Sequence, residues 1–144
     1  MNLLLDTHIW LWALLEPDRL APRVSAALTA DDVRRWLSPL SIWEALLLIE
    51  RGRLSVDQPP TEWVREALRR APVEEAPLTV EVAIASRALT MRHQDPVDRF
   101  LAATAQVFEL TLVTADAHLL ALNGLSLLPN TVSRRRPGRP RTKR

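Results

Sequence analysis

Four acidic residues stand where an α/β protein usually carries its functional site. Asp6 directly follows an apolar run, and Asp116 comes two residues after a run rich in β-formers. Glu44 and Asp98 lie in the first turns of predicted helices. Carboxylates that gather together repel one another, and a hard divalent cation such as Mg²⁺ or Mn²⁺ relieves that repulsion. Such a cation lowers the pKa of a water and promotes its attack on a phosphodiester.

The motif "HQDPVDRFLAATA" at 93–105 contains two of the acids of this chain. Asp95 precedes Pro96, and this pair is typical of a helix N-cap followed by the first helical residue. Asp98 then falls at the third helical position, where an acid interacts favourably with the helix dipole. The motif alone leaves open whether Asp98 only stabilises the helix or also holds a metal.

The other three acids differ in how well a structural role explains them. Glu44 follows Ser41 by three residues, which is the spacing of a capping box. Asp116 can cap the short helix after it. Asp6 is the hardest to explain structurally, because an acid placed directly after a buried strand has little structural reason to be there. Together the four positions indicate a metal site, although no single one does.

Alternating strands and helices must position these acids. The sequence predicts strands at 3–5, 34–39, 73–78, 110–116 and 125–129. It predicts helices at 8–18, 20–31, 41–54, 59–71, 79–92, 95–105 and 117–124. This alternation favours a parallel sheet with helices on both faces, because parallel strands need crossover connections. Ligands of such sheets bind beyond the carboxyl ends of the strands, which is where the acids fall.

The first helix carries apolar residues at helical spacing, at Ile9, Trp12 and Ala13. Trp10 and Trp12 point to opposite sides of it, so one of the two is expected to be partly exposed. We interpret the five tryptophans as core or interface residues and the three histidines as surface or packed residues, because no metal-ligand spacing connects the histidines.

Length and composition limit the class of protein. A chain of 144 residues with 47% apolar residues predicts one globular domain. The absence of cysteine excludes a disulfide framework, a thiolate zinc site and a cysteine nucleophile. The apolar start lacks a basic region and a cleavage pattern, and no stretch is long enough to span a bilayer. We therefore expect a cytoplasmic protein with no membrane contact.

The charge is divided unevenly along the chain. The segment 134–144, "RRRPGRPRTKR", contains seven basic residues and no acid. Without them the net charge of +2 becomes −5 for residues 1–133. We predict a folded domain at 1–130 and a disordered basic tail at 131–144, which attracts nucleic acid nonspecifically.

The order of four motifs resembles a known family. "LLLDTHIWLW", "SIWEALLLIERGRL", "HQDPVDRFLAATA" and "LTLVTAD" are similar to segments of the PIN-domain ribonucleases, in particular the VapC-type toxins of type II toxin–antitoxin pairs. The resemblance covers about residues 1–130. It implies a three-layer α/β/α sandwich with a five-stranded parallel sheet. It also implies RNA cleavage that depends on Mg²⁺ or Mn²⁺, a homodimer and neutralisation by an antitoxin protein.

The same resemblance assigns residues to the site. The four acids of the family fall on Asp6, Glu44, Asp98 and Asp116, both as metal ligands and as catalytic residues. Asp95 falls on a secondary, capping position.

Three supporting positions follow from the same motifs. Thr7 and Thr114 place hydroxyls beside the site, where they can orient a ligand acid or a water. Arg99 either contacts the phosphate of the substrate or braces Asp98, and the sequence does not decide between these roles.

Two other functions fit parts of the sequence. A module without catalysis would use the basic tail to bind nucleic acid or a partner protein, with the acids acting as caps. Deletion of 134–144 separates this hypothesis from a nuclease, because it would abolish the function of such a module but only weaken the RNA affinity of a nuclease. A phosphatase or receiver domain of flavodoxin type is disfavoured, because Asp6 is a single acid and Lys143 is the only lysine.

Overall fold

The computed structural model of the chain describes residues 1–92 and 94–131. His93 and all of the predicted tail except Thr131 lie outside the described residues. The predicted disorder and nucleic-acid binding of the tail therefore stay predictions.

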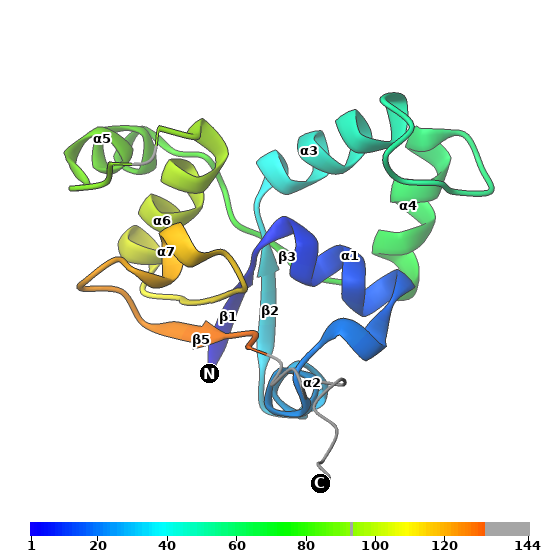
Figure 1. Cartoon of the computed structure of the whole chain (residues 1–144), viewed down its shortest axis with the longest axis horizontal. Helices are drawn as coiled ribbons and strands as arrows, with labels where there is room; N and C mark the ends of the chain where they lie inside the picture. The colour runs from blue at the N-terminus through cyan, green and yellow to red at the C-terminus, as the bar shows by residue number, and fades with distance from the viewer. Residues whose placement is uncertain (93, 132–144) are drawn as a thin grey trace, which may run out of the picture.

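A five-stranded parallel sheet forms the centre of the fold (Figure 1). Its order is β3-β2-β1-β4-β5. The strands are β1 (Asn2–Leu5), β2 (Arg34–Leu37), β3 (Glu74–Glu75), β4 (Thr111–Thr114) and β5 (Leu127–Pro129). The predicted fold class is confirmed, including the short strand near 74 that had the weakest pattern.

Seven α-helices and one 3₁₀ turn connect the described strands. They are α1 (Thr7–Leu15), η1 (Pro17–Arg19), α2 (Pro22–Thr29), α3 (Pro39–Glu50), α4 (Pro60–Arg70), α5 (Val80–Ala88), α6 (Pro96–Phe108) and α7 (Ala117–Leu120). None of these helices is long and apolar enough to cross a membrane.

The central strand β1 contributes side chains to two separate hydrophobic cores, because successive side chains of a strand point to opposite faces of the sheet. Leu3 and Leu5 pack into one core with apolar residues of α1, α2, α3 and α4. Leu4 packs into the other with α6 and α7, and α5 lies outside α6. The two groups of helices flank the sheet in Figure 1, which gives the three layers expected from the sequence.

Two helices begin earlier than predicted, and both differences affect the site. Helix α1 starts at Thr7, with Asp6 as its N-cap. Helix α3 starts at Pro39, because the hydroxyl of Ser38 accepts a hydrogen bond from the amide of Leu40. The predicted start at Ser41 is wrong, and Glu44 lies in the second turn of α3 rather than the first.

The buried face of α1 also differs from the periodicity of the sequence. Ile9, Trp10 and Leu11 are buried, whereas Trp12 is half-buried and Ala13 is exposed. The helix is apolar on all sides, so periodicity could not identify the face that meets the sheet. The expectation that one of two neighbouring tryptophans is partly exposed is confirmed, and Trp12 is that residue.

Candidate active site

The carboxyl ends of the parallel strands bring all the predicted acids to one cleft. Asp6 follows β1 and Asp116 follows β4, and β1 and β4 are neighbours in the sheet. The cleft has a volume of about 580 Å³, and its five acids are Asp6, Glu44, Asp95, Asp98 and Asp116. Three of them also cap helices that begin at the cleft, namely Asp6, Asp95 and Asp116.

Asp6 is buried and held by two hydrogen bonds. One oxygen accepts from the amide of Thr7 at 2.7 Å, and the other accepts from the hydroxyl of Thr114 at 2.6 Å. Burial raises the pKa of Asp6 above its usual range, and these two hydrogen bonds offset part of that rise. Asp6 was expected to have little structural reason for its position, but the structure gives it one, since it caps α1. The hydrogen bond to its second oxygen comes from Thr114, which is 108 residues away in the sequence.

Thr114 connects two of the acids. Besides donating its hydroxyl to Asp6, it accepts a hydrogen bond from the amide of Asp116 at 3.0 Å. Its side chain is completely buried. Thr114 therefore orients Asp6 and positions the start of the segment that carries Asp116.

If the cleft supports the RNA cleavage that the sequence motifs imply, Thr114→Val is expected to lower its rate about 10- to 100-fold, the usual effect of losing a group that orients a metal ligand. Valine keeps the shape of threonine but leaves the second oxygen of Asp6 without its donor. Thr114→Ser is the matched control, because it keeps the hydroxyl. Cleavage rates measured over a Mg²⁺ titration test this, and equal rates for the valine and serine variants would contradict the role of Thr114.

Asp98 is buried at the third position of α6. Asp95 caps this helix by accepting hydrogen bonds from the amides of Val97 at 2.9 Å and of Asp98 at 3.4 Å. Burial, followed by the negative charges of Asp116, Asp95, Asp6 and Glu44, raises the pKa of Asp98 to about 7. The structural roles predicted for Asp95 and Asp98 are both present, and in addition Asp98 lines the cleft.

Glu44 reaches the cleft from α3, which a buried hydrogen bond fixes to α1. The hydroxyl of Thr7 donates to the hydroxyl of Ser41 at 2.9 Å, one turn before Glu44. Ser41 is therefore used for this contact and not for the predicted capping box. Thr7 contacts Asp6 through its amide, whereas its hydroxyl, which was predicted to orient a ligand acid or a water, donates to Ser41 of α3.

Comparison with known proteins identifies the family. A PIN domain is recognised over residues 3–125, which is most of the chain. This chain belongs to the PIN-domain family. Over 120 residues it is 32% identical to Ribonuclease VapC22 of Mycobacterium tuberculosis (strain ATCC 25618 / H37Rv), covering 82% of this chain and 89% of the relative. The predicted VapC-type family is confirmed.

Solved structures confirm the fold of this PIN domain. VapBC2 from Rickettsia felis, bound to a DNA fragment from its promoter, matches with a TM-score of 0.68 and 16% identity over 90% of this chain and 98% of that chain. A toxin–antitoxin complex from Klebsiella pneumoniae matches with a TM-score of 0.65 and 19% identity over the same shares of the two chains.

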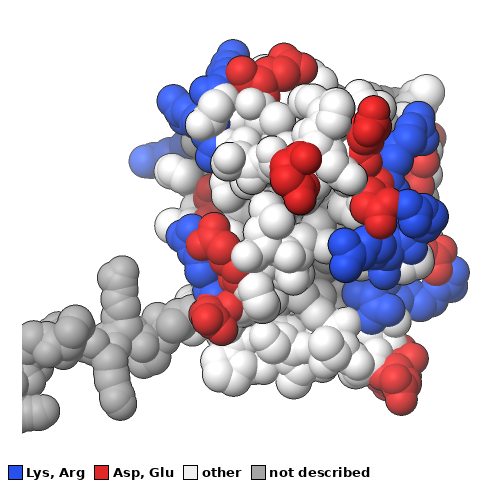
Figure 2. Space-filling view, turned by 90° about the vertical axis from the view of Figure 1, so that its right-hand side faces the viewer, with Lys and Arg blue, Asp and Glu red and all other residues white. Residues whose placement is uncertain are grey.

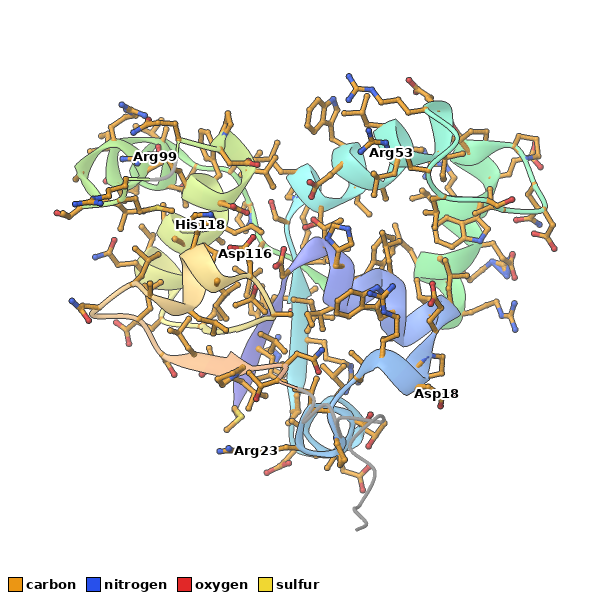
Figure 3. The ribbon with its side chains drawn as sticks, in the orientation of Figure 1. Asp18, Arg23, Arg53, Arg99, Asp116 and His118 are labelled. Atoms are coloured by element: carbon orange, nitrogen blue, oxygen red, sulfur yellow. The ribbon has the colours of Figure 1, made fainter. Side chains whose placement is uncertain are left out.

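Arg99 of the PIN domain stabilises the segment that leads to the cleft. It is buried, and its guanidinium donates to the carbonyls of Ser86, Leu89 and Met91 at 3.0–3.2 Å. Figure 3 shows Arg99 where α5 and α6 meet. Neither role predicted from the sequence anticipated these bonds, which fix the end of α5 and the residues after it as far as Met91.

The acids of the PIN domain fit a hydrated divalent cation. Within residues 1–92 and 94–131, no three His, Asp or Glu side chains are arranged to hold a metal ion directly. Mg²⁺ usually retains several waters and binds one or two carboxylates. A cleft of about 580 Å³ lined with five carboxylates provides both the oxygen ligands and the space for those waters.

Besides the acids and Ala115, four residues line the cleft that sequence reasoning did not place there: His8, Trp12, Arg19 and His118. The spacing of His8 and Trp12, one turn apart on the helix that follows Asp6, was the available signal. It was weak, because neither residue belongs to a ligand motif.

Proposed function

We propose that this PIN domain is the toxin of a toxin–antitoxin pair and that it cleaves RNA with the help of Mg²⁺ or Mn²⁺. The observation that carries this proposal is the buried Asp98, whose pKa is raised to about 7 in a cleft with four other acids. A perturbed acid in a cleft is typical of a functional site. The name of the VapC22 relative supports ribonuclease chemistry.

Asp6, Glu44, Asp98 and Asp116 would hold the cation. When bound, the cation supplies a water of lowered pKa and stabilises the negative charge that develops on the phosphate. Asp98 accepts a proton near neutral pH when no cation is present, because it is buried and four other carboxylates surround it. As a ligand it would have to be ionised, so it would give up that proton on binding a cation.

The surrounding residues keep these acids in place. Thr114 orients Asp6, the Thr7–Ser41 bond fixes α3 and with it Glu44, and Asp95 caps α6. Fixed ligands lower the reorganisation needed during the reaction, which is how electrostatic preorganisation contributes to a rate.

The partners proposed for this chain are an RNA substrate, an antitoxin protein and a second copy of the chain. The similar solved structures include toxin–antitoxin complexes, which supports an antitoxin. The side chain of Trp43, on α3 beside the cleft, is 53% exposed. An exposed tryptophan suits a protein partner, since this residue type is enriched in interface hot spots.

Asp6→Asn tests the function. Asparagine still accepts from the Thr7 amide and still reaches Thr114, so the variant is expected to fold. We expect metal-dependent cleavage of a tRNA pool by the parent protein and a loss of at least about 100-fold in the variant. Asp57→Asn, an exposed acid in the loop before α4, is the control and is expected to retain activity.

Three outcomes would count against this function. An Asp6→Asn variant that folds and cuts RNA as fast as the parent would exclude Asp6 from the site. Cleavage that persists in a chelator and in the variant would show that a contaminating nuclease is responsible. RNA binding without cleavage by the parent protein would favour the module without catalysis.

A further inference from the structure

One wall of the cleft consists of residues that suit a nucleotide rather than a metal. His8, Trp12 and Arg19 line the acidic cleft. The same three residues line a second, adjoining hollow of about 280 Å³, which contains none of the five cleft acids and is also lined by Glu16 and Arg53. We call these three residues the α1 wall. It connects the acidic cleft with a hollow that has a second arginine.

The α1 wall brings three flat groups together, with the Arg19 guanidinium stacked on Trp12 and the His8 ring tilted against Trp12. The guanidinium of Arg19 lies over the Trp12 ring, 4.3 Å from its centroid. The ring of His8 lies 5.9 Å from that of Trp12, tilted by 52°. His8 is exposed, Trp12 is half-buried, and the Arg19 side chain is 55% exposed. The stack is thus preformed and accessible.

Arg19 is only weakly engaged in the fold. Its ion pair with Glu16 is long, at 3.7 Å, and both side chains are more than half exposed. An exposed pair of this kind contributes little to stability. The cation is therefore available to an anion that enters the cleft, and its stacking on Trp12 limits the side-chain freedom lost on binding.

The charge distribution around the cleft suggests what the arginine of the α1 wall binds. Five acids in the cleft repel the phosphates of a nucleic acid, so cations beside the cleft must hold the strand. On the face over α4, basic and acidic side chains border an uncharged area, and no purely basic patch is visible there (Figure 2). Arg19 and Arg53 instead line the hollow that adjoins the cleft, and Figure 3 shows Arg53 close to α3, in the loop that follows this helix.

We propose that the α1 wall binds the nucleotide next to the cleaved phosphodiester, with its base stacked on Trp12 and His8 and its phosphate bound to Arg19. The strand then continues into the adjoining hollow towards Arg53. This inference rests on the proposed function, because it assumes an RNA substrate. It assigns His8, Trp12 and Arg19 to positioning an unpaired nucleotide beside the acids.

Single-stranded RNA fits this wall better than a duplex. Unpaired bases can leave their stack and rest on aromatic rings or on a guanidinium, whereas the bases of a duplex are stacked on each other. Stacking on one aromatic residue is tolerant of base identity. The wall therefore selects an unpaired nucleotide more strongly than a particular base.

Binding measurements on the full chain test the proposal. Asp98→Asn serves as the background, so that RNA is bound and not cut. Fluorescence anisotropy in Mg²⁺ gives the affinity for a short single-stranded oligoribonucleotide at several salt concentrations. Trp12→Leu, Trp12→Phe and Arg19→Gln are compared in this background, with Arg23→Gln as the control. Arg23 is an exposed arginine on α2, outside both hollows (Figure 3).

The two wall residues are expected to differ in their salt dependence. Trp12→Leu weakens binding about 5- to 100-fold and leaves the salt slope unchanged, because a base contact releases no counterion. Trp12→Phe recovers most of the affinity. Arg19→Gln lowers the slope of log affinity against log salt by about 0.7, the value for one phosphate contact of a single strand. Arg23→Gln changes neither quantity.

Three results would overturn this inference. Unchanged affinity in both Trp12→Leu and Arg19→Gln would show that RNA binds elsewhere, and the proposed function would stand if the parent protein still cut RNA. A duplex bound as tightly as the single strand, and equally sensitive to Trp12→Leu, would exclude the stacked base. Absence of both RNA binding and cleavage in the parent would instead refute the proposed function, and this inference with it.

Discussion

Asp98→Asn is expected to lower RNA cleavage by about three orders of magnitude and at the same time to stabilise the metal-free protein at pH 8. The activity falls because asparagine removes an anionic ligand from the proposed cation site, and cation stabilisation of a phosphoryl transition state amounts to several kcal/mol. The stability rises because Asp98 is buried beside four acids and must be charged at that pH.

The pH dependence of this stabilisation follows from the raised pKa. Between the ordinary pKa of 3.8 and the folded value of about 7, the native state holds a proton that the unfolded chain has released. The stability of the parent protein therefore falls as pH rises through this window and levels off above it. The asparagine side chain does not titrate, so the variant gains nothing at pH 4 and most at pH 8, by about 2–4 kcal/mol.

Thermal unfolding without metal, at pH 4, 6 and 8, measures this effect. The variant's Tm should exceed that of the parent by roughly 5–10 °C at pH 8, given the usual change in Tm per kcal/mol for a chain of this size. Added Mg²⁺ should raise the Tm of the parent far more than that of the variant, because binding to the native state stabilises it. A variant less stable than the parent at pH 8 would contradict the claim that the buried, ionised carboxylate of Asp98 destabilises the metal-free protein.

Asp95→Asn is the matched control for this experiment. It removes a carboxylate from the same cleft and the same helix turn, but asparagine caps a helix as well as aspartate does. We expect most of the cleavage activity to remain, since Asp95 acts chiefly by accepting hydrogen bonds from the first turn of α6. A loss as large as that of Asp98→Asn would assign Asp95 to the metal ligands.

Arg99→Met is expected to lower the free energy of unfolding by about 3–5 kcal/mol, because the carbonyls of Ser86, Leu89 and Met91 lose their donor. Methionine fills similar space but cannot donate hydrogen bonds to them. Buried groups that lose a charged hydrogen-bond partner are costly, at about 1–3 kcal/mol each. Cleavage should fall as well, because the released segment leads directly to the cap of α6.

Denaturant unfolding and amide hydrogen exchange test the role of Arg99. Exchange should accelerate at the end of α5 and at the start of α6 before it changes in the sheet. Arg87→Met, an exposed arginine on α5, is the control and should change stability by less than about 0.5 kcal/mol. If Arg99→Met is as stable as Arg87→Met, the three carbonyls do not depend on Arg99.

The predictions for Asp98 and Arg99 concern the same property of the cleft. Its carboxylates repel one another, and hydrogen bonds elsewhere in the fold keep them close. Ionised Asp98 is expected to lower the stability of the metal-free protein, and the hydrogen bonds of Arg99 and Thr114 hold the segments that carry the acids. Sites that bind or react with ligands often lower stability in this way.

The sequence determined the fold class and the edge of the sheet where the acids meet. Short apolar runs alternate with helical segments, and only a parallel sheet with crossover helices accommodates that order. Because parallel strands all end at one edge, Asp6 and Asp116 were expected at the same edge, whereas the pairing of β1 with β4 that makes them neighbours came from the tertiary structure. The conclusions drawn from the sequence needed only the local patterns of apolar residues and the general rules for connecting parallel strands.

The tertiary structure alone decided how each side chain is used. The partners of Asp6, Thr7 and Arg99 include Thr114, Ser41 and Ser86, which are 108, 34 and 13 residues away from them. The buried face of α1, and with it the position of Trp12 in the cleft, depended on how the helix packs on the sheet. Hydrogen bonds and burial of this kind arise between segments distant in sequence, so no local pattern records them.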